Sequence, residues 1–173
     1  MSFPDFTDPV LFPTFATIPT SEGQQAPSSG EGGSGVLLAQ VKDNMTIVKP
    51  TLVLMDREAS PFALIFDGLG RDDLDLKGLG FRKGATAVIP GARKTVPEQE
   101  GKRPFVRVEE GKAGEVKAIP ATLERVLALG ARYRTAAQAE GGEGKGCETC
   151  GKEGPDVVKC VGCSVARYCG KVS

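Results

Sequence analysis

The chain has 173 residues, enough for one packed domain and a small accessory module but not for two full-sized hydrophobic cores. Its 22 basic and 22 acidic residues balance, so net charge favours neither nucleic acid nor a strongly charged protein as a partner. Histidine is absent, which excludes Ser/His and Cys/His nucleophile pairs and the commonest general base. No apolar run reaches the roughly 18 to 20 residues that cross a bilayer. We therefore expect a non-enzymatic protein of the nucleus or cytoplasm with no membrane contact.

Residues 1–35 form a segment rich in Pro, Ser, Gly and Thr. Its scattered phenylalanines are Phe3, Phe6, Phe12 and Phe15. Such a composition buries too little apolar surface to offset the entropy of the chain, so we expect residues 1–35 to be a disordered tail. The alternative interpretation is a short linear motif around residues 12–15.

From Val36 the chain changes to short apolar and β-branched runs separated by turn-forming residues, which is typical of an antiparallel β domain. The runs are 36–41, 45–55, 62–66, 85–89, 105–108 and 115–119. We expect this domain over residues 36–119, with residues 67–80 as its main irregular connection. The order of strands, a long connection and further strands is compatible with an OB-like barrel. A different small barrel or a sandwich is the alternative.

A helical pattern follows the last strand. Pro120 suits a first helical turn, and Leu123, Val126 and Leu127 lie on one stripe. We expect a helix over residues 120–136 that packs against the barrel, then a small, glycine-rich linker over residues 137–146. The predicted fold class is therefore mainly β with one C-terminal helix (α+β), followed by a small zinc-binding module.

All five cysteines fall within residues 147–173. They form two C-x-x-C pairs separated by nine residues, with a single cysteine after five more: Cys147, Cys150, Cys160, Cys163 and Cys169. In a reducing compartment, clustered cysteines are more often metal ligands than disulfides. Thiolates from tight turns are the usual ligands of structural zinc, so the sequence predicts that these cysteines bind Zn²⁺.

Residues 160–171, with the sequence CVGCSVARYCGK, resemble the middle of a MYND-type zinc finger. That family pairs two C-x-x-C motifs and then has an aromatic-Cys step, here Tyr168-Cys169. The stretch 79–89 followed by 105–109 also resembles the barrel region that precedes MYND fingers in some fungal proteins. The resemblance implies that the five cysteines occupy the first five ligand positions, and that the finger docks protein partners through short proline-containing peptides.

The finger departs from the family pattern at its end. Ser173 stands where the sixth ligand is expected, so we expect a finger truncated after its fifth cysteine, and a reading frame that enters an intron is one hypothesis for its cause. The interleaved scheme of the family implies one site from Cys147, Cys150 and Cys169. The alternative is a zinc ribbon, in which the first four cysteines share one ion.

The main functional hypothesis is thus a zinc-dependent protein-interaction protein. The alternative is a nucleic-acid-binding OB-like barrel with an accessory zinc segment. The basic residues available for it are Lys77, Arg82, Lys83, Arg93, Lys94, Lys102, Arg103 and Arg107. The barrel phenylalanines, Phe62, Phe66, Phe81 and Phe105, lie in apolar runs, where packing in the core is the more natural role than base stacking.

Overall fold

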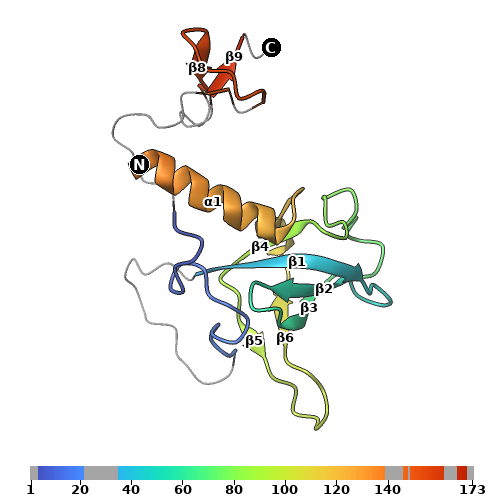
Figure 1. Ribbon diagram of the computed structural model, residues 1–173. Helices are drawn as coiled ribbons and strands as arrows, with labels where there is room; N and C mark the ends of the chain where they lie inside the picture. Colours follow the sequence, from blue (N-terminus) through green and yellow to red (C-terminus); the bar gives the residue numbers. More distant parts are fainter. Residues whose placement is uncertain (1–3, 22–34, 139–145, 148, 162–166, 171–173) are drawn as a thin grey trace. The chain divides into compact units, whose positions relative to one another are not determined.

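Strands dominate the computed structural model, which describes residues 4–21, 35–138, 146–147, 149–161 and 167–170 (Figure 1). The chain divides into two compact units, Phe6–Leu127 and a second made of Met1–Asp5 with Ala128–Ser173. In the described part of the chain, no helix has the length and apolarity that crossing a membrane requires.

Seven strands form the main sheet, in the order β5-β6-β3-β2-β1-β4-β7. They are β1 (Val36–Asn44), β2 (Thr51–Asp56), β3 (Pro61–Phe66), β4 (Thr86–Pro90), β5 (Lys94–Thr95), β6 (Phe105–Val108) and β7 (Lys117–Ile119). A short 3₁₀ helix, η1 (Ala113–Glu115), precedes β7, and helix α1 (Leu123–Gln138) follows it. The second sheet is a hairpin of β8 (Val157–Lys159) and β9 (Arg167–Cys169). The mainly β, α+β class is confirmed.

A short bend joins two strands near opposite ends of the main sheet. Strand β4 pairs with β1, and β5, only three residues further along, pairs with β6 on the opposite side of the sheet. Gly91 lies in the bend with φ 61°, a backbone conformation that favours glycine. The sheet is antiparallel except that β3 and β6 run parallel, so the expected antiparallel barrel is a mixed one. This order agrees with a small barrel-like fold, and the finer OB-like assignment stays a prediction.

The barrel core follows from strict alternation along the central strands. In β2 the buried positions include Leu52 and Leu54, and in β3 they are Phe62, Leu64 and Phe66. Alternate residues of a strand point to opposite faces of the sheet, so these side chains fill the interior of the barrel. Of the four barrel phenylalanines, only Phe105 stays partly exposed.

Residues 6–21 pack on the barrel, so the expected disordered tail is wrong for this segment. Ile18 is 4% exposed and belongs to the barrel core, and Phe15 stacks on Phe62 with ring centroids 4.5 Å apart. Thr20 pairs with Lys94 in a parallel bridge that extends the edge of β5. The apolar side chains of this segment bury enough surface against the barrel to offset the entropy of ordering it. Residues 22–34 lie outside the described residues.

Asp56, at the end of β2, fastens this N-terminal segment to the barrel. Its side chain is 3% exposed. One carboxylate oxygen accepts a hydrogen bond from the backbone N–H of Phe15 at 2.8 Å. The other accepts from the backbone N–H groups of Glu58 and Ser60, at 3.0 and 2.9 Å. A single buried carboxylate therefore holds both the β2–β3 turn and a segment 41 residues away in sequence.

Helix α1 begins later than expected, because Thr122 caps it. The Thr122 hydroxyl accepts a hydrogen bond from the backbone N–H of Arg125 at 3.3 Å, as an N-cap residue does. Leu123 and Val126 are buried, so the predicted apolar stripe faces the interior at the start of the helix. The helix then runs to Gln138, two residues into the expected linker.

Candidate metal centre

The first C-x-x-C pair lies in a tight turn. The backbone N–H of Gly151 donates to the carbonyl of Cys147 at 2.7 Å, and the N–H of Cys147 donates to the carbonyl of Lys152 at 2.9 Å. Gly151 has φ 71°, in the left-handed region where a side chain would be strained. The sequence Cys147-x-x-Cys150-Gly151 thus folds as a turn that presents both thiols to one point.

Strand β9 brings the third thiol to the same point. In the β8–β9 hairpin, Cys169 lies opposite Val157, and Tyr168 opposite Val158. This register places Cys169 beside the turn, and its sulfur lies 3.3 Å from that of Cys150.

The sulfur atoms of Cys147, Cys150 and Cys169 all lie within 4.8 Å of one another. Tetrahedral zinc with Zn–S bonds near 2.3 Å separates its sulfur ligands by roughly 3.8 Å, so the three thiols fit one ion after small side-chain movements. Cys147 is buried, whereas Cys150 and Cys169 are exposed. Among the described residues, no fourth Cys, His, Asp or Glu joins this group. The three-cysteine cluster therefore offers three of the four ligands of a structural zinc site.

Two thiols of the cluster have pKa values shifted in opposite directions. Backbone hydrogen bonds, from Cys169 foremost and then from Cys150 and Thr149, lower the pKa of the Cys147 thiol to about 6. Hydrogen bonds with the side chains of Cys150 and Cys147 raise the pKa of Cys169 to about 11. Because a metal ion binds thiolates, occupation of the cluster has to displace the proton of Cys169.

The other two predicted ligands are placed differently. Cys160 directly follows β8, is partly exposed and lies outside the three-cysteine cluster. Cys163 lies outside the described residues. The grouping of Cys147, Cys150 and Cys169 is the one that the interleaved scheme implies, whereas a zinc ribbon requires Cys160 in the group. The role of all five as metal ligands stays a prediction.

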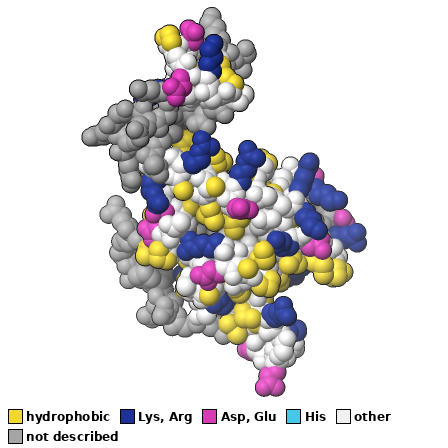
Figure 2. Space-filling model, in the orientation of Figure 1, with side chains coloured by type: hydrophobic (Ala, Val, Ile, Leu, Met, Phe, Trp, Pro, Cys, Tyr) yellow, Lys and Arg dark blue, Asp and Glu magenta, His cyan; other side chains and the backbone are white. Residues whose placement is uncertain are grey.

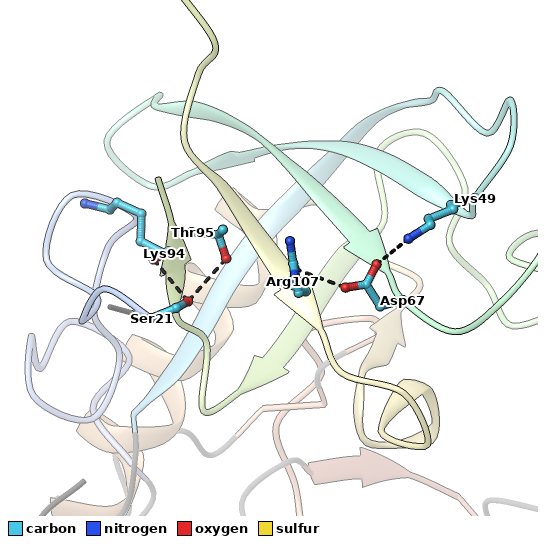
Figure 3. Close-up of polar contacts among 6 residues, drawn as sticks. All are labelled: Ser21, Lys49, Asp67, Lys94, Thr95 and Arg107. Atoms are coloured by element: carbon cyan, nitrogen blue, oxygen red, sulfur yellow. Dashed lines mark hydrogen bonds and ion pairs between the residues drawn. The ribbon is translucent and has the colours of Figure 1, made fainter. Parts of the chain in front are cut away.

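On the face that Figure 2 shows, Lys and Arg side chains lie interspersed with acidic ones and do not form one stripe. Asp67, directly after β3, accepts a hydrogen bond from Lys49 at 2.8 Å and forms an ion pair with Arg107 at 3.0 Å (Figure 3). The Lys94 ammonium donates to the carbonyl of Ala16 at 3.0 Å. Several basic groups thus make contacts within the protein. The sequence alone did not reveal that Asp67 pairs with Lys49 and Arg107, because these residues are distant in the chain.

A groove of about 1070 Å³ runs beside the β4–β5 bend and the end of β6. Its charged lining is Asp67, Arg93, Arg107, Glu109, Glu110, Lys112 and Glu115. Glu109 and Lys112 pair at 2.6 Å, and Arg107 pairs with Asp67. With its charges nearly balanced and largely paired, the groove does not gather one sign of charge toward a ligand.

No family model and no curated protein matches the chain. Among solved structures, it is similar to a crystal structure of Schizosaccharomyces pombe Pot1pC bound to single-stranded DNA (CGGTTACGGT). The two share 11% identity and a TM-score of 0.37, over 66% of this chain and 97% of that chain. What this protein binds therefore has to be inferred from its own residues.

Proposed function

We propose that this protein is a zinc-binding, non-enzymatic interaction protein, in which Zn²⁺ held by Cys147, Cys150 and Cys169 orders a MYND-type module. The observation that supports it is the approach of three thiols, two from the Cys147–Gly151 turn and one from strand β9, to within 4.8 Å of one another. Zinc is the common structural ion for such an all-thiolate set. We also propose that the protein resides in the nucleus or cytoplasm, because these reducing compartments keep thiols available for metal binding.

The described residues of the zinc-binding module contain almost no buried side chains. Of its described residues between 146 and 170, only Cys147 is buried. Val158 and Val161 are 55% and 99% exposed. A segment of this size without buried apolar side chains cannot offset its chain entropy, and metal ligation is the usual substitute. Zinc binding and folding of the module are therefore expected to be one event.

The same exposure supports a docking role. Val158 lies on β8 opposite Tyr168, so apolar and aromatic surface is presented on a short two-stranded sheet. Such a surface suits contact with an apolar peptide segment, and by resemblance to MYND fingers we expect short proline-containing peptides of partner proteins. Binding of this kind should vanish on chelation, because the sheet depends on the ion.

Metal analysis of the full chain, purified without added metal and combined with thiol labelling, tests the proposal. We expect one zinc per chain, with Cys147, Cys150 and Cys169 protected until a chelator is added, and Cys160 labelled from the start. A protein without zinc whose five thiols all react would contradict the proposal. Protection of Cys160 together with labelling of Cys169 from the start would instead indicate the zinc ribbon.

A second candidate function, binding of single-stranded nucleic acid, is favoured by the outer face of the barrel. Val53, Ala63 and Phe105 form a cross-strand row over β2, β3 and β6. The guanidinium of Arg107 lies 5.6 Å from the centre of the partly exposed Phe105 ring. Aromatic rings beside arginines stack bases without sequence preference. We place this function second because Arg107 is already paired with Asp67.

Titration of the full chain with a labelled single strand of about 10 nucleotides tests this second function. Phe105→Ala and Arg107→Ala are each expected to weaken binding about tenfold, because stacking contributes roughly 1 to 3 kcal/mol per base. Arg125→Ala, an exposed change at the start of α1, is the control. Affinity that is unchanged in Phe105→Ala, or that does not fall with added salt, would exclude it.

A further inference from the structure

Two thiols of the three-cysteine cluster are in contact with each other and with solvent. The sulfur atoms of Cys150 and Cys169 are 3.3 Å apart, and both residues are exposed. A disulfide bond is about 2.05 Å long, so a movement of little more than 1 Å would join them. Cys147, the third member of the cluster, is 5% exposed and so is shielded from solutes.

We propose that Cys150 and Cys169 form an oxidation site, at which a peroxide converts the two thiols to a disulfide and so removes two of the three zinc ligands. The release of zinc rests on the proposed function, whereas formation of the disulfide rests only on the geometry of the two thiols. The chemical class of the oxidant is a hydroperoxide, with hydrogen peroxide as its simplest member.

The reaction takes two steps. The thiolate of one cysteine attacks one oxygen of hydrogen peroxide, an S–O bond forms, the O–O bond breaks, and the departing hydroxide takes up a proton to become water. The sulfur of the second cysteine then attacks the sulfenic acid, the S–S bond forms, and the S–O bond breaks with loss of a second water. Two thiols lose two electrons in total, and one peroxide is reduced to two waters.

Among the four cysteines that the structure describes, exposure and distance select this pair. Peroxide reaches Cys150 and Cys169 from solvent, whereas Cys147 is buried. Cys160 lies outside the cluster, so its thiol is not positioned to resolve a sulfenic acid on either residue. After oxidation, Cys147 alone remains as a thiolate in the cluster, and a single thiolate does not hold zinc. The disulfide would then link the Cys147–Gly151 turn to β9 in place of the metal.

Peptide mapping of the full chain tests the proposal directly. Trypsin cleaves after Lys145, Lys152, Lys159, Arg167 and Lys171. The first C-x-x-C pair is therefore found in peptide 146–152, the second in 160–167, and Cys169 alone in 168–171. Metal-free and zinc-loaded protein are treated with hydrogen peroxide, alkylated and digested. A chromogenic chelator follows zinc release from the loaded sample.

We expect peptide 146–152 to become linked to peptide 168–171, two hydrogens lighter than the reduced pair, with zinc released in step. The link should persist in Cys147→Ser and Cys160→Ser and disappear in Cys150→Ser. Peptides that stay unlinked, or a link to peptide 160–167, would overturn the proposal. The two proposals fail separately: a chain that forms the link without ever holding zinc contradicts only the zinc function, and a zinc-loaded chain that resists peroxide contradicts only the oxidation site.

Discussion

Replacing Asp56 by alanine is expected to lower the free energy of unfolding by about 3 to 5 kcal/mol. The buried carboxylate accepts three backbone hydrogen bonds, from Phe15, Glu58 and Ser60. Hydrogen bonds to a charged group contribute about 1.5 to 3 kcal/mol each, and water replaces part of this at the exposed Glu58. Denaturant unfolding of the full chain, monitored by far-UV circular dichroism, measures the change.

The matched control for this prediction is Asp73→Ala. Asp73 is exposed, and its carboxylate accepts a hydrogen bond from the backbone N–H of Gly70 at 2.7 Å. Because water can replace that bond, the substitution should cost less than about 1 kcal/mol. Asp56→Asn keeps one acceptor oxygen and should fall between the two. Equal effects of Asp56→Ala and Asp73→Ala would show that the three hydrogen bonds of Asp56 add no more to stability than one solvent-exposed bond.

The strands were predictable where burial imposes alternation over several residues, as in β2 and β3. The run 45–55 was expected to be one strand, yet β2 begins only at Thr51. Met45, Ile47 and Val48 lie before it and are 52%, 73% and 74% exposed. Pro50 lacks the N–H that a continuing ladder would use, so the chain turns there despite its apolar side chains. Strand β5 has only two residues, too few to show any period.

Order in the N-terminal segment could not be inferred from composition averaged over residues 1–35. The glycine- and serine-rich second half of this segment lowers the average hydrophobicity of the whole. The contacts that order the first half also join residues that are far apart in the sequence. Phe15 meets Asp56 and Phe62, and Ser21 meets the strand of Lys94 and Thr95. Local patterns do not reveal such pairs, because the partners are brought together only by the folding of the whole β domain.

The candidate metal residues were predictable from C-x-x-C spacing, but their grouping was not. The register of β8 against β9 decides whether the thiol of Cys160 or that of Cys169 lies close to the first C-x-x-C pair. That register sets Cys169 opposite Val157, next to the turn that holds Cys147 and Cys150. Spacing alone left both arrangements open, and the resemblance to MYND fingers implied the grouping that the structure brings together.

Substituting any member of the three-cysteine cluster by serine is expected to weaken zinc binding by about 100-fold or more. Loss of a supporting group that only orients a ligand already costs roughly 10- to 100-fold, and loss of a ligand costs more. Since we propose that folding of the module is coupled to zinc binding, the β8–β9 hairpin is also expected to lose its protection against proteolysis. Competition with a chromogenic chelator measures the affinity of Cys147→Ser, Cys150→Ser and Cys169→Ser.

Cys160→Ser is the control that decides between the two arrangements. In the interleaved site Cys160 contributes no ligand, so this variant should keep the affinity of the unmodified chain. In a zinc ribbon Cys160 is a ligand and Cys169 is not, so the effects of Cys160→Ser and Cys169→Ser would be exchanged. Serine is close to cysteine in size but is a poor zinc ligand, so the comparison reports loss of the thiolate more than loss of packing. An affinity reduced by Cys160→Ser and untouched by Cys169→Ser would therefore place the ion between the two C-x-x-C pairs.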